Sequence, residues 1–333
     1  MTKEKNNRIV SGMRPTGKLH LGHYHGVLDN WLKLQKDHDC YFFVADWHAL
    51  TTEYEKPADM SENTIEMVID WLSVGIDPDK SVIFLQSGVK EHAELYVLLS
   101  MITPIGWLER NPTYKEQLRE LKTRDIHTYG FLGYPVLQTA DIVIYRAGAV
   151  PVGQDQAPHV ELSREIVRRF NHLYGQTFPE PQTLLTEAPK VLGTDGRKMS
   201  KSYDNSIYIS DEPDVIEKKI RTMVTDTARQ KKTDPGNPEV CPVYITFHKL
   251  YSNEETLNWV QNGCTKAEFG CIECKNSVIP KVLERLAPVR EKRAELEKDR
   301  SLVMDIIKRD TDKARAVAVE TMEVVREKLG LGN

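Results

Sequence analysis

The chain has 333 residues, of which 40% are hydrophobic and 28% are charged, a composition typical of globular proteins and unlike that of disordered or fibrous ones. Its net charge of −4 excludes a global positive field that attracts nucleic acid, so any RNA binding must use local basic patches. No apolar run approaches the roughly 18 residues of a membrane span. The N-terminal segment Met1–Lys5 lacks the apolar core of a signal peptide, so a cytoplasmic protein is expected.

Apolar segments and helical patterns alternate along the first part of the chain. Apolar runs at 8–12, 41–45 and 81–85 predict short buried strands, and apolar residues at three- and four-residue steps predict helices over 21–35 and 59–74. This alternation favours an α/β fold, here a Rossmann-like, doubly wound parallel sheet. Further helices are predicted over 134–145, 159–172, 215–224, 280–309 and 312–329.

The first predicted crossover contains the segment His20-Leu21-Gly22-His23. A helix N-terminus at the carboxyl end of a strand offers free backbone N–H groups to a phosphate. Gly22 would let a flat base approach the backbone closely. His20 and His23 share a helical face and can donate to phosphate or ribose oxygens. Two isolated histidines are more often exposed or capping residues, so the pattern needs support from the rest of the chain.

A basic loop over residues 193–202 is the second candidate for phosphate binding. Gly193 and Gly196 make it flexible, and Lys198 and Lys201 follow them. A lysine ammonium is a mobile point charge with three donors, which suits a polyphosphate. An exposed basic turn is the alternative interpretation.

The sequences HLGH at 20–23 and KMSKS at 198–202 match, in this order, the two signatures of class I aminoacyl-tRNA synthetases, and the chain resembles that family. The resemblance implies that an amino-acid carboxylate attacks the α-phosphate of ATP, with Mg²⁺ on the phosphates, and that the acyl group then passes to tRNA. It assigns the catalytic roles to His20, His23, Lys198 and Lys201. The ATP site that it implies comprises Arg14, Pro15, Thr16, Gly22, His23, Gly153, Gln154, Asp155, Val191, Lys198, Met199, Ser200, Lys201 and Ser202.

The apolar helix predicted over 134–145 carries one acid, Asp141. A buried carboxylate without a donor is costly, so Asp141 needs a partner within the protein or an N–H group of a bound ligand. This segment, with residues 45–51 and 12–26, closely resembles the tryptophanyl-tRNA synthetase family, in which the corresponding acid accepts the indole N–H. The resemblance implies a tryptophan site that comprises His48, Tyr134, Gln138, Asp141 and Gln156.

Two positions depart from the family pattern. Gln138 stands where many bacterial members have methionine, and the segment 153–156 has a glutamine where glutamate is usual. Tyrosyl-tRNA synthetases use a glutamine and an acid in a similar helix, so a tyrosyl relative is the alternative. Residues 156–175 resemble tryptophanyl members throughout, and tryptophan is therefore the expected substrate.

Four of the five cysteines, Cys241, Cys264, Cys271 and Cys274, have the spacing C-x22-C-x6-C-x2-C. Four thiolates can hold zinc or an iron–sulfur cluster, and spacing alone separates these poorly. A subset of bacterial tryptophanyl-tRNA synthetases has this spacing and a [4Fe–4S] cluster, so the resemblance favours the cluster, with Zn²⁺ as the alternative. Cys40 is expected to be a core residue.

The resemblance also implies the domain organisation and the partners. It implies a catalytic domain over 1–207 and a helical domain over 208–333 that reads the anticodon of tRNA(Trp), with the last helix returning to the catalytic domain. L-tryptophan and ATP are the expected substrates, and a homodimer is the expected assembly. A nucleotidyltransferase of the same superfamily would share the histidine crossover but would not need a helical domain of this size. An amino-acid sensor would be expected to have lost signature residues, and an iron–sulfur electron carrier would not need a nucleotide site.

Overall fold

The fold is described from a computed structural model, which describes residues 7–55, 57–112, 114–115, 127–186 and 189–331. Within these residues, five parallel strands form one sheet in the order β3-β2-β1-β4-β5. This is the doubly wound α/β sheet that the sequence predicts. The strands are β1 (Arg8–Met13), β2 (Asp39–Val44), β3 (Ser81–Leu85), β4 (Ala149–Val152) and β5 (Gln182–Leu185).

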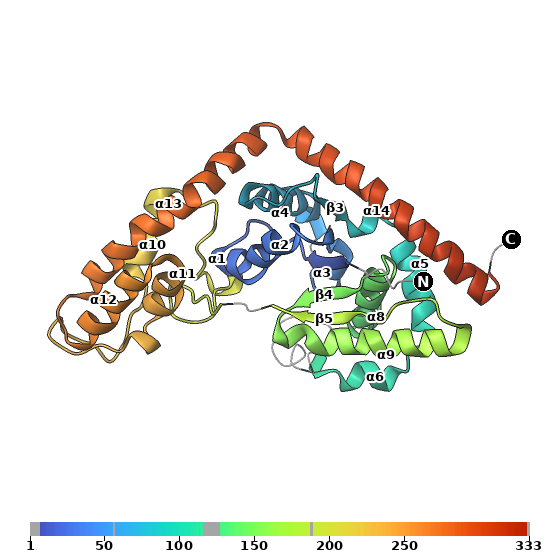
Figure 1. Cartoon of the computed structure of the whole chain (residues 1–333), viewed down its shortest axis with the longest axis horizontal. Helices are drawn as coiled ribbons and strands as arrows, with labels where there is room; N and C mark the ends of the chain where they lie inside the picture. Colours follow the sequence, from blue (N-terminus) through green and yellow to red (C-terminus); the bar gives the residue numbers. More distant parts are fainter. Residues whose placement is uncertain (1–6, 56, 113, 116–126, 187–188, 332–333) are drawn as a thin grey trace.

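Both faces of the sheet are buried, because successive residues of each strand point to opposite faces. Ile9 and Phe42 lie in one hydrophobic core, whereas their neighbours Val10 and Phe43 lie in a second core on the other face. Helices therefore cover the sheet on each side (Figure 1). The helices around the sheet are α1 (Leu21–His23), α2 (Asp29–Leu34), α3 (Asp46–Glu53), α4 (Met60–Val74), α5 (Glu91–Ser100), α6 (Ile105–Arg110), α8 (Tyr129–Val143) and α9 (Ala157–Tyr174).

The first predicted helix, over 21–35, contains a π-helical segment. Tyr24–Leu28 is wound as a π-helix between α1 and α2. The π-helix brings Tyr24 and Leu28 into the first core with Trp31 of α2. A π-helical turn within an α-helix is frequent at functional sites, and this one directly follows the histidine segment.

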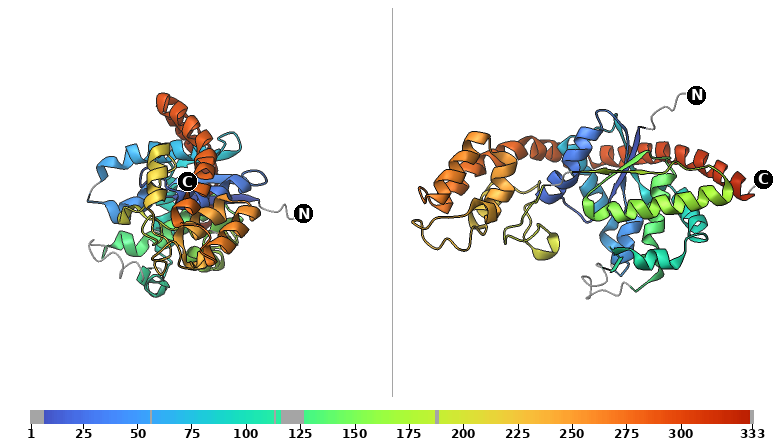
Figure 2. Two further views of the ribbon diagram at one scale, coloured as in Figure 1. Left: turned by 90° about the vertical axis from the view of Figure 1, so that its left-hand side faces the viewer. Right: turned by 60° about the horizontal axis from the view of Figure 1, so that its bottom comes forward.

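The C-terminal part of the chain is helical; the segment from α10 (Pro213–Thr222) to α13 (Cys271–Lys298) extends to one side of the sheet, whereas α14 (Arg300–Leu329) runs back along it (Figures 1 and 2). None of the described helices is long and apolar enough to cross a membrane. Between α10 and α13 lie α11 (Lys249–Tyr251) and α12 (Glu254–Thr265).

The boundary predicted between the last two helices, at residues 309–312, is wrong. The break lies at Asp299, whose backbone leaves the helical region and whose side chain accepts the Leu302 N–H at 3.2 Å. Aspartate is a preferred N-cap because its oxygen satisfies an N–H group that the helix leaves free. Pro280 and Pro288 lie within α13 and do not end it.

Helix α14 returns to the sheet and lies along its edge strand β3 (Figure 1). Asp310 is fully buried and accepts the Ile83 N–H at 3.1 Å, and Thr311 accepts the Leu85 N–H at 3.2 Å. The first core contains residues from both sides of position 207, such as Leu28 and Phe247. The division into domains at that position stays a prediction.

Candidate active site

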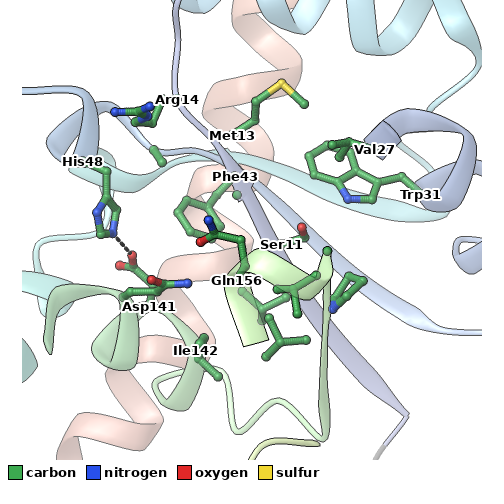
Figure 3. A pocket seen from close by; sticks show the side chains of 18 of the residues that line it. Ser11, Met13, Arg14, Val27, Trp31, Phe43, His48, Asp141, Ile142 and Gln156 are labelled. Atoms are coloured by element: carbon green, nitrogen blue, oxygen red, sulfur yellow. Dashed lines mark hydrogen bonds and ion pairs between the residues drawn. The ribbon is translucent and has the colours of Figure 1, made fainter. Parts of the chain in front are cut away.

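A cavity of about 380 Å³ lies at the carboxyl ends of β1 and β4. This is where ligands bind in open α/β sheets. The cavity brings together seven of the residues that the sequence singled out for ATP and tryptophan, and Figure 3 shows several of them. The seven are Arg14, His48, Tyr134, Gln138, Asp141, Gly153 and Gln156.

Asp141 lies at one end of this cavity, on α8, and its side chain is fully buried. Burial alone would raise the pKa of its carboxyl group, but hydrogen bonds from His48 and His92 lower that pKa to about 2. Nε2 of His48 lies 2.8 Å from Oδ2, and Nδ1 of His92 lies 2.5 Å from Oδ1. Asp141 is therefore a carboxylate at neutral pH, in a setting where charge–charge and charge–dipole interactions are strong.

Two partners of Asp141, Gln86 and His92, were not expected from the sequence. Gln86 follows β3 directly, and its amide is oriented because Oε1 accepts the Trp47 N–H at 3.1 Å while Nε2 donates to both carboxylate oxygens at 2.9 Å. His92 is fully buried, and its second nitrogen lies 2.6 Å from the Tyr145 hydroxyl. The position of Gln86 at the carboxyl end of a predicted strand was the signal that could have identified it.

The two signature histidines form a compact turn at the start of the helix. Nδ1 of His20 accepts the Gly22 N–H at 3.1 Å, and Nδ1 of His23 accepts the His20 N–H at 3.3 Å. Burial and the nearby Lys201 lower the pKa of His20 to about 4, and burial lowers the pKa of His23 well below its usual value. Both rings are therefore neutral, and since each Nδ1 accepts, each proton is on Nε2. The turn thus has two Nε2–H donors available for a phosphate.

The lysine loop lies against this turn. Lys201 donates to the carbonyl oxygen of Thr16 at 2.5 Å and to its hydroxyl at 3.2 Å, and Met199 is buried beside Gly22. Burial lowers the pKa of the Lys201 ammonium to about 8. Lys198 pairs with Leu192 in an antiparallel bridge and is exposed. The loop thus packs against the histidine turn, with Lys201 as a cation beside two neutral imidazole rings.

Asn205 holds the shape of the lysine loop. Its Oδ1 accepts the Ser200 N–H at 2.8 Å, and its Nδ2 donates to Asp195 Oδ1 at 2.7 Å and to the Lys198 carbonyl at 3.2 Å. Asn205 was not expected as a site residue. Its role depends on a turn geometry that residue spacing does not reveal.

Comparison with known proteins decides the family. The family model described as "tRNA synthetases class I (W and Y)" matches residues 2–287, most of the chain. The chain belongs to this family. Two tryptophan–tRNA ligases are close relatives of this synthetase over nearly their whole length. The one from Thermotoga maritima is 53% identical over 97% of this chain and 99% of its own, and the one from Aquifex aeolicus is 47% identical over 97% and 100%.

Solved structures agree with the fold of this class I synthetase. The tryptophanyl-tRNA synthetase of Campylobacter jejuni, complexed with ADP and tryptophan, superposes with a TM-score of 0.87 at 36% identity and covers 97% of this chain and 100% of its own. A tyrosyl-tRNA synthetase from Archaeoglobus fulgidus has a TM-score of 0.66 at 21% identity, over 88% of this chain and 91% of its own, and shares the fold.

The remaining ATP-site residues expected for this synthetase occupy different positions. Pro15 and Val191 are buried, whereas Thr16 and Ser202 are exposed. Gln154 and Asp155 lie in a short 3₁₀ turn before α9, and the side chain of Asp155 is outside the described part of the structure. These residues flank the cavity and the lysine loop and stay predictions for ATP binding.

All four candidate ligand cysteines of this synthetase line one small cavity between α12, α13 and the segment that precedes α11. Cys274 is buried and lies 3.2 Å from Nε2 of His248. Burial, and to a lesser extent the other three thiols, raise the pKa of Cys274 to about 12. Within the described residues, no group of three or more His, Cys, Asp or Glu side chains is arranged to hold a metal ion.

Two buried cations accompany these thiols. Arg229 donates to Phe269 O at 2.6 Å and lies 3.7 Å from Cys264 Sγ, and Lys275 donates to Arg221 O at 2.8 Å. Among the described residues, no carboxylate forms an ion pair with either cation. Four thiolates around a metal carry an excess negative charge, which two such cations would partly neutralise. The four thiols and the two cations thus have the composition of a thiolate metal site, but within the described residues they are not arranged to hold a metal ion.

Proposed function

We propose that this protein activates L-tryptophan with ATP and transfers it to tRNA(Trp). The observation that carries the proposal is the fully buried Asp141 at one end of the cavity, whose pKa is about 2. An ionised carboxylate in a closed site accepts the indole N–H, and a site built around such a bond rejects analogues that lack the donor, by about 10⁴–10⁵ in favourable cases. Tyr134, Gln138, Gln156 and His48 complete the tryptophan site.

In the first step, the tryptophan carboxylate attacks the α-phosphorus of ATP, and the bond to the bridging oxygen of pyrophosphate breaks. The product is tryptophanyl-adenylate, and pyrophosphate takes the electron pair of the broken bond. Such transfers depend on positioning and on neutralisation of developing charge. The Nε2–H groups of His20 and His23 donate to phosphate oxygens of ATP, which would enter as its magnesium complex. Lys198 and Lys201 neutralise the negative charge of the leaving pyrophosphate.

The rest of the ATP site frames the nucleotide. Arg14, Pro15 and Thr16 follow β1, and Gly153–Asp155 follow β4, so both segments lie at the carboxyl edge of the sheet. Gly22 and Val191, with the loop residues Met199, Ser200 and Ser202, line the approach to the phosphates. In the second step the activated acyl group passes to the terminal ribose of tRNA, and the C-terminal helices supply the surface for the anticodon.

Amino-acid-dependent exchange of pyrophosphate into ATP tests this function. We expect exchange with tryptophan and not with tyrosine. Asp141→Asn removes the charge that accepts the indole N–H and should lower kcat/KM for tryptophan by about 10- to 100-fold, because hydrogen bonds to charged groups are worth roughly 1.5–3 kcal/mol. Asp79→Asn, the same change at an exposed acid outside the cavity, should retain tryptophan exchange. Exchange with tyrosine in preference to tryptophan would identify a tyrosyl enzyme.

We propose that the four cysteines hold a [4Fe–4S] cluster, with a zinc ion as the alternative. The donor set of Cys241, Cys264, Cys271 and Cys274 around one cavity supports a metal centre, and the resemblance of their spacing to that of iron–sulfur synthetases favours iron. When bound, the cluster would cross-link α12, α13 and the segment before α11. No activation step requires it, so its role is structural.

We also propose that the protein is a homodimer. Exposed apolar side chains lie on or next to α5, α6 and α8, and α8 packs against both α5 and α6. Met101 is 74% exposed, Tyr129 70% and Ile105 63%, and large exposed apolar patches mark protein–protein contacts. A second copy of the chain is the partner expected for this surface.

A further inference from the structure

The clearest connection between the C-terminal helices and the activation site runs through Asp70, on α4. Its side chain is fully buried, and each of its oxygens has a distinct partner. Oδ2 accepts the backbone N–H of Leu19 at 2.7 Å, and Oδ1 accepts from the guanidinium group of Arg293 on α13. One carboxylate therefore bonds both to the segment before the histidine turn and to the C-terminal helix α13.

Leu19 is the residue immediately before the histidine turn. His20 caps the first helical turn, and its backbone N–H donates to Nδ1 of His23. A displacement of Leu19 moves the backbone of His20, and with it both Nε2–H donors. Asp70 touches neither ring, so it acts on the histidines through the backbone.

Arg293, the second partner of Asp70, is also buried and held by several acidic side chains. Its side chain is 4% exposed, and it also forms ion pairs with Glu66 of α4 and, at 3.0 Å, with Glu297. It belongs to α13, the helix that carries Cys271 and Cys274 at its start. A planar guanidinium group with several partners fixes orientation more strictly than a lysine would.

We propose that Asp70 and Arg293 form a latch through which helix α13 positions the Leu19–His23 turn for ATP, so that the C-terminal helices control amino-acid activation. Asp70 is then a positioning residue. The carboxylate also favours the charged form of Lys201, which ties the lysine loop to the same group. Misplacement of reacting groups by about 1 Å costs roughly 100-fold in rate, so a small shift of this latch is sufficient.

The inference rests on the proposed ligase function, and exchange by the unaltered protein establishes that function first. Arg293→Met leaves the Asp70 charge buried and unpaired, so this variant is expected to be unstable as well as slow. Adding Asp70→Asn removes the orphaned charge while an amide oxygen can still accept from Leu19. If the latch is correct, the double variant recovers its melting temperature but keeps a kcat for exchange about 10- to 100-fold low, with KM for tryptophan little changed.

Two further variants keep the test independent of folding. Arg293→Lys retains one donor and should retain more of kcat than Arg293→Met. Arg326→Gln, the matched control, breaks another contact between the C-terminal helices and the sheet region, the 2.5 Å ion pair with Glu94, and should leave kcat unchanged. Recovery of kcat together with stability in the double variant would overturn the proposal, and so would an equal loss of kcat in Arg326→Gln.

Discussion

Nδ1 of His92 lies 2.5 Å from Oδ1 of Asp141, and neither side chain is exposed to solvent. The opposite nitrogen of His92 lies 2.6 Å from the Tyr145 hydroxyl, so the ring is held at both ends. The acid in the amino-acid site is thus fixed in position before any ligand enters. Pre-organisation of this kind lowers the cost of binding, because the protein groups do not need to be ordered by the ligand.

The stability contributed by Asp141 should disappear in acid. Its folded-state pKa, about 2, lies below the ordinary value of 3.8, so this stability is present above about pH 4 and is lost as pH falls toward 2. The shift corresponds to about 2 kcal/mol. Urea unfolding of the protein and of Asp141→Asn between pH 2 and pH 6 checks this. The difference in unfolding free energy should be largest above pH 4 and should shrink below it; a constant difference would contradict the assignment.

Activity should depend on the protonation of Lys201. Burial lowers the pKa of its ammonium to about 8, so the positive charge is lost as pH rises through that value in the free enzyme. We expect kcat/KM for ATP, measured by pyrophosphate exchange, to fall above about pH 8. Lys201→Arg keeps its charge throughout this range and should move the fall to higher pH at a lower overall rate. Lys190→Arg, an exposed position before the loop, is the control; a fall at the same pH in Lys201→Arg would show that another group titrates.

The dimer surface predicts a change in molecular mass. Met101→Glu places a charge on the proposed apolar contact surface and should convert the protein to a monomer, because burial of an unpaired charge is costly. Light scattering during size-exclusion chromatography measures the mass. Leu173→Glu, on α9 at 49% exposure, adds the same charge outside the patch and should leave the dimer intact. A wild-type protein that is monomeric at micromolar concentration would remove the basis of this prediction.

The cysteine site predicts a coloured protein. With a [4Fe–4S] cluster the purified chain absorbs broadly near about 400 nm, where iron–sulfur centres with thiolate ligands absorb. Cys274→Ser should abolish the absorbance and the bound iron and should lower the melting temperature, since a cross-link of three helical segments is lost. Cys40→Ala, at a cysteine buried in β2, should keep both iron and colour. A colourless protein with one zinc ion per chain would decide for zinc.

The sequence predicted those parts of the fold that local pattern determines. The strand over Ser81–Leu85 and the helix at Met60–Val74 follow from apolar periodicity, and the position of Asp141 in an apolar helix indicated a buried carboxylate that needs donors. His48, Tyr134 and Gln138 were found by resemblance, and the structure brings all three to the cavity with Asp141.

Long-range partners could not be predicted, because they depend on how the elements pack. His92 reaches Asp141 because α5 packs against α8, and Gln86 reaches it from the end of β3. The sequence did not predict the two partners of Asp70, because a single acidic residue in a helix is usually exposed to solvent. The break at Asp299 was missed because the residues on both sides favour a helix. The Asp299 side chain nevertheless caps a new helix there, since its oxygen accepts the Leu302 N–H.

Helix α14 has a consequence for how the protein is made. Strand β3 is at one end of the sheet, and its Ile83 and Leu85 N–H groups are satisfied by Asp310 and Thr311, residues that the ribosome adds more than 200 positions later. Until that helix has emerged, the nascent sheet has an open edge of the kind that pairs with other chains. The sheet therefore stays open at this edge until α14 is made and packs against β3, and the helix then closes the edge.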